Sequence, residues 1–177
     1  MDLRRSSLAT IRRAVPVEAK ILTELTLRSK AYWGYDDIFV AAVQQNLTIT
    51  PDYVEANPVF VLEEGAQVQG FYSLKASAAT DEVELDFLFI EPAGIGTGYG
   101  KQLWQHAVCT GRQTGFHTML IEAEPQAEEF YKKMGAVRVA TKPSPLAHIF
   151  PGRVLPVLRF DLTLAGDDWL VKVQGCA

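Results

Sequence analysis

Four glycines alternate with other residues immediately before a predicted helix. They are Gly94, Gly96, Gly98 and Gly100, in the run I-E-P-A-G-I-G-T-G-Y-G-K-Q-L of residues 90–103. Residues without Cβ let backbone N–H groups approach an anion at the positive end of a helix dipole. The run fits neither the dinucleotide pattern GxGxxG nor the Walker pattern GxxxxGK[ST]. It therefore predicts a pyrophosphate cradle of another kind, with a tight strand-to-helix connection that binds nothing as the alternative.

Two carboxylates stand on the segment before this loop. Residues 82–90, E-V-E-L-D-F-L-F-I, have the composition of a strand. A period of two puts Val83, Leu85, Phe87 and Phe89 on one face, and Glu84, Asp86, Leu88 and Ile90 on the other. Neighbouring carboxylates can act as general bases, or they can be solvated residues on an exposed strand face.

The remaining elements follow as a mixed α/β order. Helical spacing covers 17–30, a second helix starts after Asp36 or Asp37, and a third begins at the glycine loop. A fourth helix begins at Pro125 and ends at Gly135. Strands are predicted at 10–14, at 59–62 and 68–74 as a hairpin, and at 82–90, 117–121, 136–139 and 154–164. Antiparallel strands thus come first and a βαβα order follows.

Length and charge limit the class of protein. The chain has 177 residues, 48% of them hydrophobic, with a net charge of −4. This argues against a basic nucleic-acid-binding surface, and no run approaches the roughly 18 apolar residues of a membrane helix. We expect a tail at 1–9, one domain at 10–164 and a second tail at 165–177. Cys109 and Cys176 lack metal or redox spacing, which predicts reduced thiols and a cytoplasmic protein.

The glycine loop resembles motif A of the GNAT superfamily of acetyl-CoA-dependent N-acetyltransferases. The core of that motif is [RQ]-x-x-G-x-[GA], and the matching positions here are Ile95, Gly98 and Gly100. The glycines agree, whereas Ile95 replaces the opening Arg or Gln. Residues 123–136, A-E-P-Q-A-E-E-F-Y-K-K-M-G-A, resemble motif B of the same family. Its matching positions are Ala127, Phe130, Tyr131 and Gly135, while Glu124 replaces a frequent Asn and Ala136 a frequent Phe.

The resemblance implies a fold and a cosubstrate. The expected fold is a central, mostly antiparallel sheet with helices on both faces and an acetyl-CoA site where strand 82–90 meets the following helix. The family's binding mode places the pantetheine arm along Leu88 and Ile90, with the Leu88 amide a candidate donor to the acetyl carbonyl. It places the pyrophosphate on the loop formed by Ile95, Gly96, Thr97, Gly98, Tyr99, Gly100 and Lys101. We expect no metal.

The same resemblance assigns catalytic roles. Tyr131, by its place in the F-Y-x-x-x-G pattern, corresponds to the general acid that protonates the departing thiolate; on composition alone it is a core tyrosine. Glu84 stands eleven residues before Ile95, an offset at which some members of the family carry the general base. Asp86, or water alone, is the alternative base.

The acceptor is the least defined part. Trp33 and Tyr35, with Arg28 and Tyr32, form an aromatic and basic cluster that could hold an acceptor with a carboxylate or simply seal a loop. His148 and Arg153 could reach the acceptor or cap a turn. We expect acetyl transfer to a primary amine of a small molecule or peptide. We expect no nucleic-acid or membrane partner, and the sequence leaves open whether the protein forms a homodimer. A non-catalytic acyl-CoA sensor is the alternative function; Tyr131 favours the enzyme.

Overall fold

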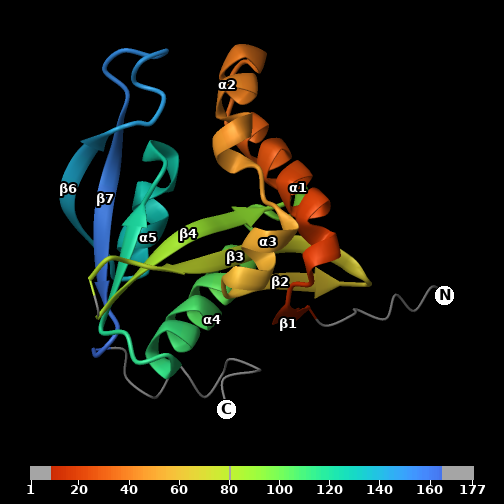
Figure 1. Cartoon of the computed structure of the whole chain (residues 1–177), viewed down its shortest axis with the longest axis vertical. Helices are drawn as coiled ribbons and strands as arrows, with labels where there is room; N and C mark the ends of the chain where they lie inside the picture. Colours follow the sequence, from red (N-terminus) through yellow and green to blue (C-terminus); the bar gives the residue numbers. More distant parts are fainter. Residues whose placement is uncertain (1–8, 80, 165–177) are drawn as a thin grey trace.

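The computed structural model describes residues 9–79 and 81–164 (Figure 1). The predicted tail at 165–177, and all but the last residue of the tail at 1–9, lie outside these residues. The strands are β1 (Thr10–Arg13), β2 (Val59–Glu64), β3 (Gln67–Ala76), β4 (Glu82–Ile90), β5 (Thr118–Glu122), β6 (Val137–Pro143) and β7 (Val154–Asp161). The helices are α1 (Ala19–Tyr32), α2 (Asp37–Leu47), α3 (Pro51–Ala56), α4 (Tyr99–Gln113) and α5 (Glu128–Lys133), with short 3-10 turns at Pro16–Glu18, Pro92–Gly94 and Pro125–Ala127.

All seven strands form one sheet, in the order β1-β2-β3-β4-β5-β7-β6. Only β4 and β5 run parallel; every other neighbouring pair is antiparallel. Helices α1 and α3 pack on one face of the sheet, and α4 and α5 pack on the other. The prediction of a mixed α/β fold with a mostly antiparallel sheet and helices on both faces is therefore confirmed.

Helices α2 and α3 each begin at a side-chain cap. The Asp36 carboxylate accepts a hydrogen bond from the Phe39 amide at 2.7 Å, so Asp36, and not Asp37, caps α2. The Thr50 hydroxyl caps α3 through the Tyr53 amide at 3.1 Å. The sequence analysis did not predict α3, although a Thr-Pro pair at its start is a typical helix signal.

Strand β4 carries a bulge that changes which side chains share a face. Ser73 pairs with Phe87 and Leu74 with Leu85, so Asp86 has no partner of its own on β3. An extra residue of this kind shifts by one position the alternation of side chains between the two faces of the sheet. The prediction that Val83, Leu85, Phe87 and Phe89 lie on one face is therefore wrong. Val83 and Leu85 pack toward α4, whereas Phe87 and Phe89 pack toward α1.

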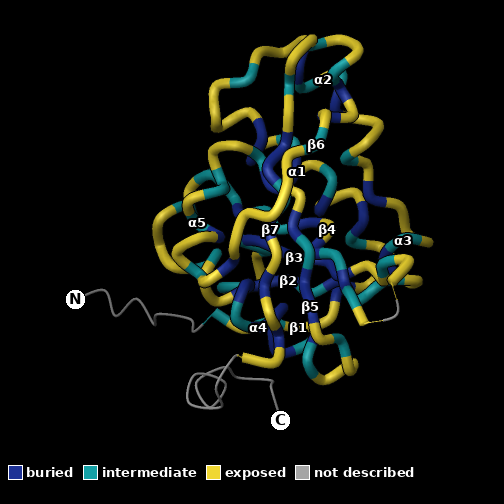
Figure 2. Tube along the Cα trace, turned by 90° about the vertical axis from the view of Figure 1, so that its left-hand side faces the viewer, coloured by how far each residue is buried: buried dark blue, intermediate teal, exposed yellow. Residues whose placement is uncertain are grey.

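The buried residues form two main clusters, one on each face of the sheet. Figure 2 shows the buried stretches of the chain in the middle of the molecule and the exposed stretches around them. One cluster is centred on Trp104 of α4, and the other on Leu22 and Leu25 of α1. A smaller apolar cluster joins α2 to the loop between β6 and β7 through Phe39, Val43 and Leu146. This third cluster closes one end of the molecule over the sheet.

Cys109 differs from its prediction. It lies buried on α4 and is disulfide-bonded, so the expectation of a reduced thiol is wrong at this position. Cys176 lies outside the described residues. Within 9–79 and 81–164, no helix is both long enough and apolar enough to cross a bilayer.

Candidate active site

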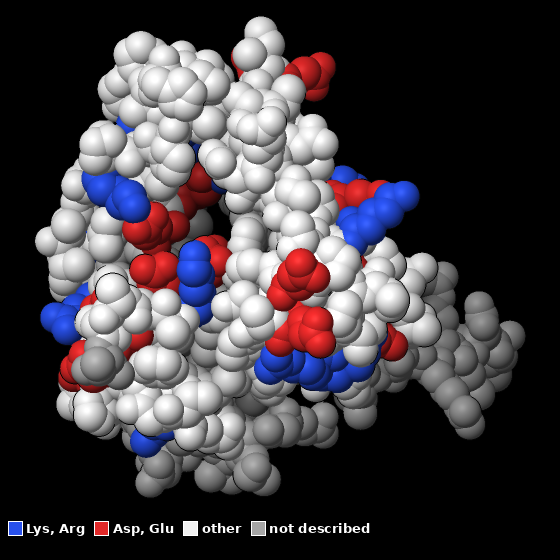
Figure 3. All heavy atoms as spheres, viewed as in Figure 1, with Lys and Arg blue, Asp and Glu red and all other residues white. Residues whose placement is uncertain are grey.

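The main cavity, of about 640 Å³, opens where β4 and β5 separate. The last residue pair between these strands is Leu85 with Ile121. Beyond it both strands line the cavity, through residues 86–90 of β4 and 122–124 at the end of β5. Acidic side chains lie in the hollow of the face drawn in Figure 3, with basic ones beside them. Because the cavity passes between two strands, groups from both faces of the sheet reach it.

The glycine loop forms one end of the cavity and offers unpaired backbone donors. Gly96 and Gly98 have φ angles of +84° and +98°, a left-handed conformation that favours glycine. The first helical hydrogen bond of α4 runs from the Gln102 amide to the Gly98 carbonyl at 3.1 Å. Ahead of it, several amides donate to no described residue, namely those of Gly96, Gly98, Tyr99, Gly100 and Lys101. Such a cluster of N–H groups at a helix N-terminus fits a pyrophosphate.

The residues predicted to bind the cosubstrate divide into two groups. Most of them line the cavity, namely Leu88, Ile90, Ile95, Gly96, Gly98, Gly100 and Lys101. The side chains of Thr97 and Tyr99 do not. The Thr97 hydroxyl donates to the Gly94 carbonyl at 2.7 Å, and the Tyr99 hydroxyl donates to Glu64 at 2.6 Å. Ile95, which replaces the polar residue of the motif, packs against the apolar core.

Glu84 lines the cavity and makes no hydrogen bond to a described residue. Burial raises the pKa of its carboxyl group, and the nearby charges of Glu122 and Asp86 raise it further. A carboxylate with a raised pKa is a stronger base than an ordinary carboxylate. No group of His, Cys, Asp and Glu side chains within the described ranges has an arrangement that would hold a metal ion.

Asp86 also lines the cavity, but its carboxylate is engaged. It accepts a hydrogen bond from the Tyr53 hydroxyl at 2.6 Å, and the same hydroxyl lies 2.8 Å from the Ser73 oxygen. Tyr53 lies on α3, so this contact joins α3 to the bulge of β4. The two acids predicted as alternative bases therefore meet at one cavity, and only Glu84 is unbonded there.

Tyr131 lies on α5 and is 6% exposed. Its ring packs edge-to-face on Trp104, with 5.6 Å between the ring centroids. Burial raises the pKa of its hydroxyl, which therefore stays protonated. That hydroxyl bonds to none of the described residues, and Tyr131 lines the cavity. Tyr131 comes from the α4 side of the sheet and Glu84 from the α1 side, so the two flank the opening between β4 and β5.

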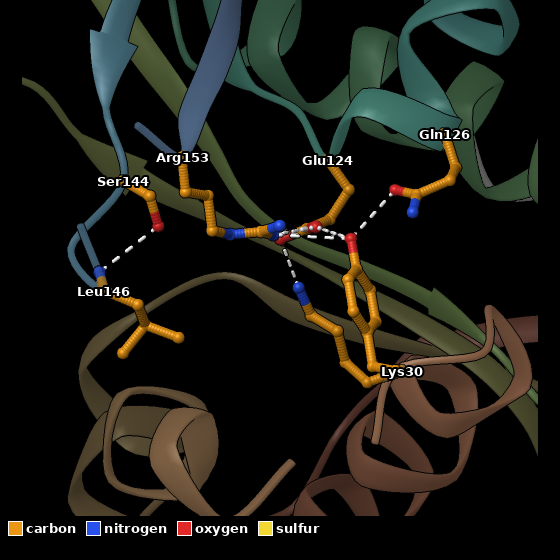
Figure 4. Close-up of polar contacts among 7 residues, drawn as sticks. Lys30, Glu124, Gln126, Ser144, Leu146 and Arg153 are labelled. Carbon is orange, nitrogen blue, oxygen red and sulfur yellow. Dashed lines mark hydrogen bonds and ion pairs between the residues drawn. The ribbon is translucent and has the colours of Figure 1, made fainter. Parts of the chain in front are cut away.

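The far end of the cavity holds a cluster of charged side chains, the Lys30–Glu124–Arg153 cluster (Figure 4). Glu124 forms ion pairs with Lys30 and, at 2.5 Å, with Arg153. It also accepts a hydrogen bond from the Tyr35 hydroxyl at 2.8 Å. Burial alone raises the pKa of Glu124, but Lys30, Tyr35 and Arg153 outweigh that effect, so the pKa is lowered. Glu124 thus stays charged at this end.

The residues considered for acceptor binding have different positions. Trp33 lines the main cavity, whereas Tyr35 lines a neighbouring cavity and reaches the main one through its hydroxyl contacts with Glu124 and Gln126. Arg28 pairs with Glu91 and lies outside the lining. His148 lies in a turn, where its Nδ1 donates a hydrogen bond to the Pro145 carbonyl at 3.0 Å. Arg153 lines both cavities, and whether it reaches an acceptor stays a prediction.

Sequence reasoning missed Lys30 as a member of the site. Lys30 is 4% exposed, yet on an amphipathic helix a lysine normally marks the solvent face. The only signal was indirect: Glu124 replaces an uncharged residue of the motif, and a buried carboxylate requires cations nearby. The identity of those cations depends on which helix covers the end of β5.

Comparisons with known proteins agree on one family. A family model described as an acetyltransferase (GNAT) domain matches residues 22–144, well over half of the chain. No curated protein sequence matches the chain significantly. Among solved structures, the PaiA N-acetyltransferase of Thermoplasma acidophilum in complex with coenzyme A has a TM-score of 0.71 at 17% identity, over 87% of this chain and 99% of that one.

Two further structures show the same fold. YncA of Salmonella typhimurium, with its cofactor acetyl-CoA, has a TM-score of 0.65 at 22% identity and covers 88% of this chain and 95% of its own. The ribosomal-protein-S18-alanine N-acetyltransferase of Escherichia coli has a TM-score of 0.64 at 17% identity, over 91% of this chain and 98% of that one. At these identities the likeness establishes the fold.

Proposed function

Since this chain belongs to the GNAT acetyltransferase family, we propose that it transfers the acetyl group of acetyl-CoA to a primary amine. The acceptor is a small molecule or the amine of a peptide. Acetyl-CoA supplies an acetyl group activated as a thioester. The protein has to bind it, exclude water around it, and move one proton from the amine and another to the sulfur.

One observation carries this proposal: the cavity passes through the sheet between β4 and β5. The amide donors of residues 96–101 lie at one end of it, and the Lys30–Glu124–Arg153 cluster lies at the other. Glu84 and Tyr131 flank the opening from opposite faces. A thioester threaded between the strands would therefore meet an acceptor from the α1 side and a proton donor from the α5 side.

The proposed roles follow from the state of each group. The Glu84 carboxylate, unbonded and with a raised pKa, takes the proton of the attacking amine, directly or through water. As the nitrogen–carbon bond forms and the carbon–sulfur bond breaks, the Tyr131 hydroxyl gives its proton to the sulfur. Main-chain N–H groups of β4 beyond Leu85 have no partner strand on the β5 side and are candidates to stabilise the acetyl oxygen.

Calorimetric titration with acetyl-CoA, CoA and ATP tests the cosubstrate first. Acetyl-CoA and CoA should bind and ATP should not, and acetyl-CoA at one hundred times its Kd should stabilise the fold by about 2.7 kcal/mol. Gly100 is the position for a matched pair of variants, because an added Cβ would meet the Phe130 ring at an ordinary 3.6 Å and no positive φ is involved.

Gly100→Ala should bind acetyl-CoA nearly as well as the wild type, and Gly100→Leu should bind it at least tenfold more weakly, because the longer side chain occupies the cradle. Thermal unfolding without ligand establishes that both variants fold. Absence of acetyl-CoA binding at millimolar concentration would overturn the proposed function. Binding without transfer to any amine would favour the acyl-CoA sensor.

A further inference from the structure

The Lys30–Glu124–Arg153 cluster is one negative charge short. Two cations, Lys30 and Arg153, share the single carboxylate of Glu124. Lys30 is 4% exposed, and Arg153 is also largely covered. A buried cation is costly unless an anion and hydrogen bonds compensate it. The cluster therefore keeps about one uncompensated positive charge at the cavity wall.

None of the other described acids of the cavity wall, Glu84, Asp86 and Glu122, forms an ion pair with Lys30 or Arg153. Glu122 pairs with Lys142 at 2.6 Å, and the Asp86 carboxylate is bonded to Tyr53. Burial lowers the pKa of Lys30 and the charge of Arg153 lowers it too, so that the pKa lies below its usual value in spite of Glu124. An additional anion in the cavity would stabilise both cations.

The Arg153 guanidinium has N–H groups that make no hydrogen bond to a described residue. Its Nη2 is used by Glu124 and, at 3.3 Å, by Tyr35. Nε is buried without any hydrogen-bond partner, and Nη1 bonds to no described residue. A buried donor without a partner is rare in folded proteins. The planar guanidinium lies over the Phe39 ring, with 4.6 Å between Cζ and the ring centroid. With Nη2 engaged, Nη1 remains as a donor for a charge-assisted hydrogen bond.

We propose, on the basis of the acetyltransferase function above, that the acceptor is a small amino acid whose carboxylate binds Arg153. Its amine would then face Glu84, which lines the same cavity. Apolar side chains of the same cavity wall, from Phe39, Val43, Leu146 and Leu155, suit an aliphatic or aromatic body. The cavity of about 640 Å³ must also hold the acetylated pantetheine arm, which leaves room for a small acceptor.

The test compares acceptors that differ only in the carboxylate. Free α-, β- and γ-amino acids are assayed with acetyl-CoA, beside the carboxamide and the decarboxylated amine of each, by release of the CoA thiol. The best amino acid should exceed its carboxamide by about 10- to 100-fold in kcat/KM, the range for a charge-assisted hydrogen bond. Binding of acetyl-CoA is measured separately by calorimetry.

Variants test whether Arg153 is the residue that causes the preference for a carboxylate. Arg153→Gln should lower kcat/KM for the amino acid to the value for its carboxamide, while the carboxamide and the Kd of acetyl-CoA change little. Arg153→Lys keeps the ion pair with Glu124 but lacks the planar fork, so its preference should be intermediate. Arg159→Gln is the matched control, because Arg159 lies on β7, the strand that directly follows Arg153, is exposed and does not line the cavity.

Three results would overturn the inference and leave acetyl transfer in place. The first is an amine without a carboxylate that reacts as well as the amino acid. The second is an equal loss for both acceptors in Arg153→Gln, which would indicate a structural role. The third is acetylation of peptide amines alone. Acetyl-CoA binding without transfer to any amino acid would also overturn it, whereas failure of acetyl-CoA to bind overturns the proposed function itself.

Discussion

The two ends of the cavity are built from different parts of the chain. The end proposed to bind the cosubstrate, called the cosubstrate end, offers backbone amides of one continuous segment, residues 96–101, which is rich in glycine. The end proposed to bind the acceptor, called the acceptor end, consists of side chains from three distant segments, brought together by Glu124. The cosubstrate end is therefore insensitive to most side-chain changes, whereas the acceptor end depends on each member of its cluster.

This difference also separates stability from binding. Main-chain donors at a helix N-terminus are satisfied by water when no ligand is bound, so they cost the fold little. Water cannot solvate the buried charges of the Lys30–Glu124–Arg153 cluster in the same way, so removal of one charge leaves the others uncompensated. The largest effects of substitution are therefore expected at the acceptor end, on the free energy of unfolding.

Glu124→Gln should give the largest loss of stability, about 3 kcal/mol, because it leaves Lys30 and Arg153 buried without a carboxylate. Urea unfolding at pH 7 measures it. Glu122→Gln, two residues earlier, is the control: its pair with Lys142 is 44% and 43% exposed and should contribute about 1 kcal/mol or less. Acetyl-CoA binding should survive in both variants. Equal stability of the two would contradict the difference drawn between the two ends.

The same pair of proteins gives a pH dependence. The pKa of Glu124 is lowered in the folded protein from its usual 4.5. Its charge therefore stabilises the fold above pH 4.5, and that stabilisation is lost as the pH falls through the lowered pKa. The difference in unfolding free energy between wild type and Glu124→Gln should shrink as the solution is acidified below pH 4.5. A difference that is constant with pH would assign the effect to shape rather than charge.

Tyr131→Phe tests the proposed general acid, which lies at the opening between the two ends of the cavity. Loss of the hydroxyl should lower kcat by about 100-fold, the low end of general acid catalysis. The Kd of acetyl-CoA and the stability should change little, because this hydroxyl bonds to none of the described residues. Steady-state kinetics with the best acceptor, and calorimetry, separate these effects. A loss of stability without a loss of kcat would reduce Tyr131 to the core residue that composition suggests.

Glu84→Gln should have a smaller effect, about tenfold in kcat/KM, since water can replace part of a base. The raised pKa of Glu84 predicts that the acid limb of the wild-type profile lies above pH 4.5, because the residue must be deprotonated to act. The substitution should remove that limb. Asp86→Asn is the comparison, and its profile should keep the limb. An unchanged profile in Glu84→Gln would exclude Glu84 as the base.

The fold was largely predictable because most of its elements are encoded locally. Gly65 and Gly135 mark a turn and a helix end, and both lie at positive φ in the structure. The bulge at Asp86 was not predictable, because it depends on how β3 pairs with β4 and not on the composition of β4 alone. That single extra residue moved Phe87 and Phe89 to the other face, which a strict period of two cannot anticipate.

The parts of the candidate site that were predictable are those whose residues are close together in the sequence. Two short motifs located the glycine loop and Tyr131, and both line the cavity. Lys30 and Arg153 join Glu124 only because α1 and the start of β7 meet at the end of β5. Arg153 stood in a Pro- and Gly-rich stretch where a turn was the simpler interpretation. Sequence patterns report neighbours along the chain, and this cluster consists of neighbours in space.

Lys101→Gln should give the smallest effect and is the sharpest test of a main-chain cradle. Lys101 is exposed, and it supplies a side-chain charge to the wall beside the free amides. If the amides hold the pyrophosphate, loss of this charge should weaken acetyl-CoA binding only about threefold, with the difference vanishing at high salt. Calorimetry at two salt concentrations measures it. A loss of a hundredfold would mean that this end, too, depends on a side chain, with Lys101 compensating for Ile95 in place of Arg or Gln.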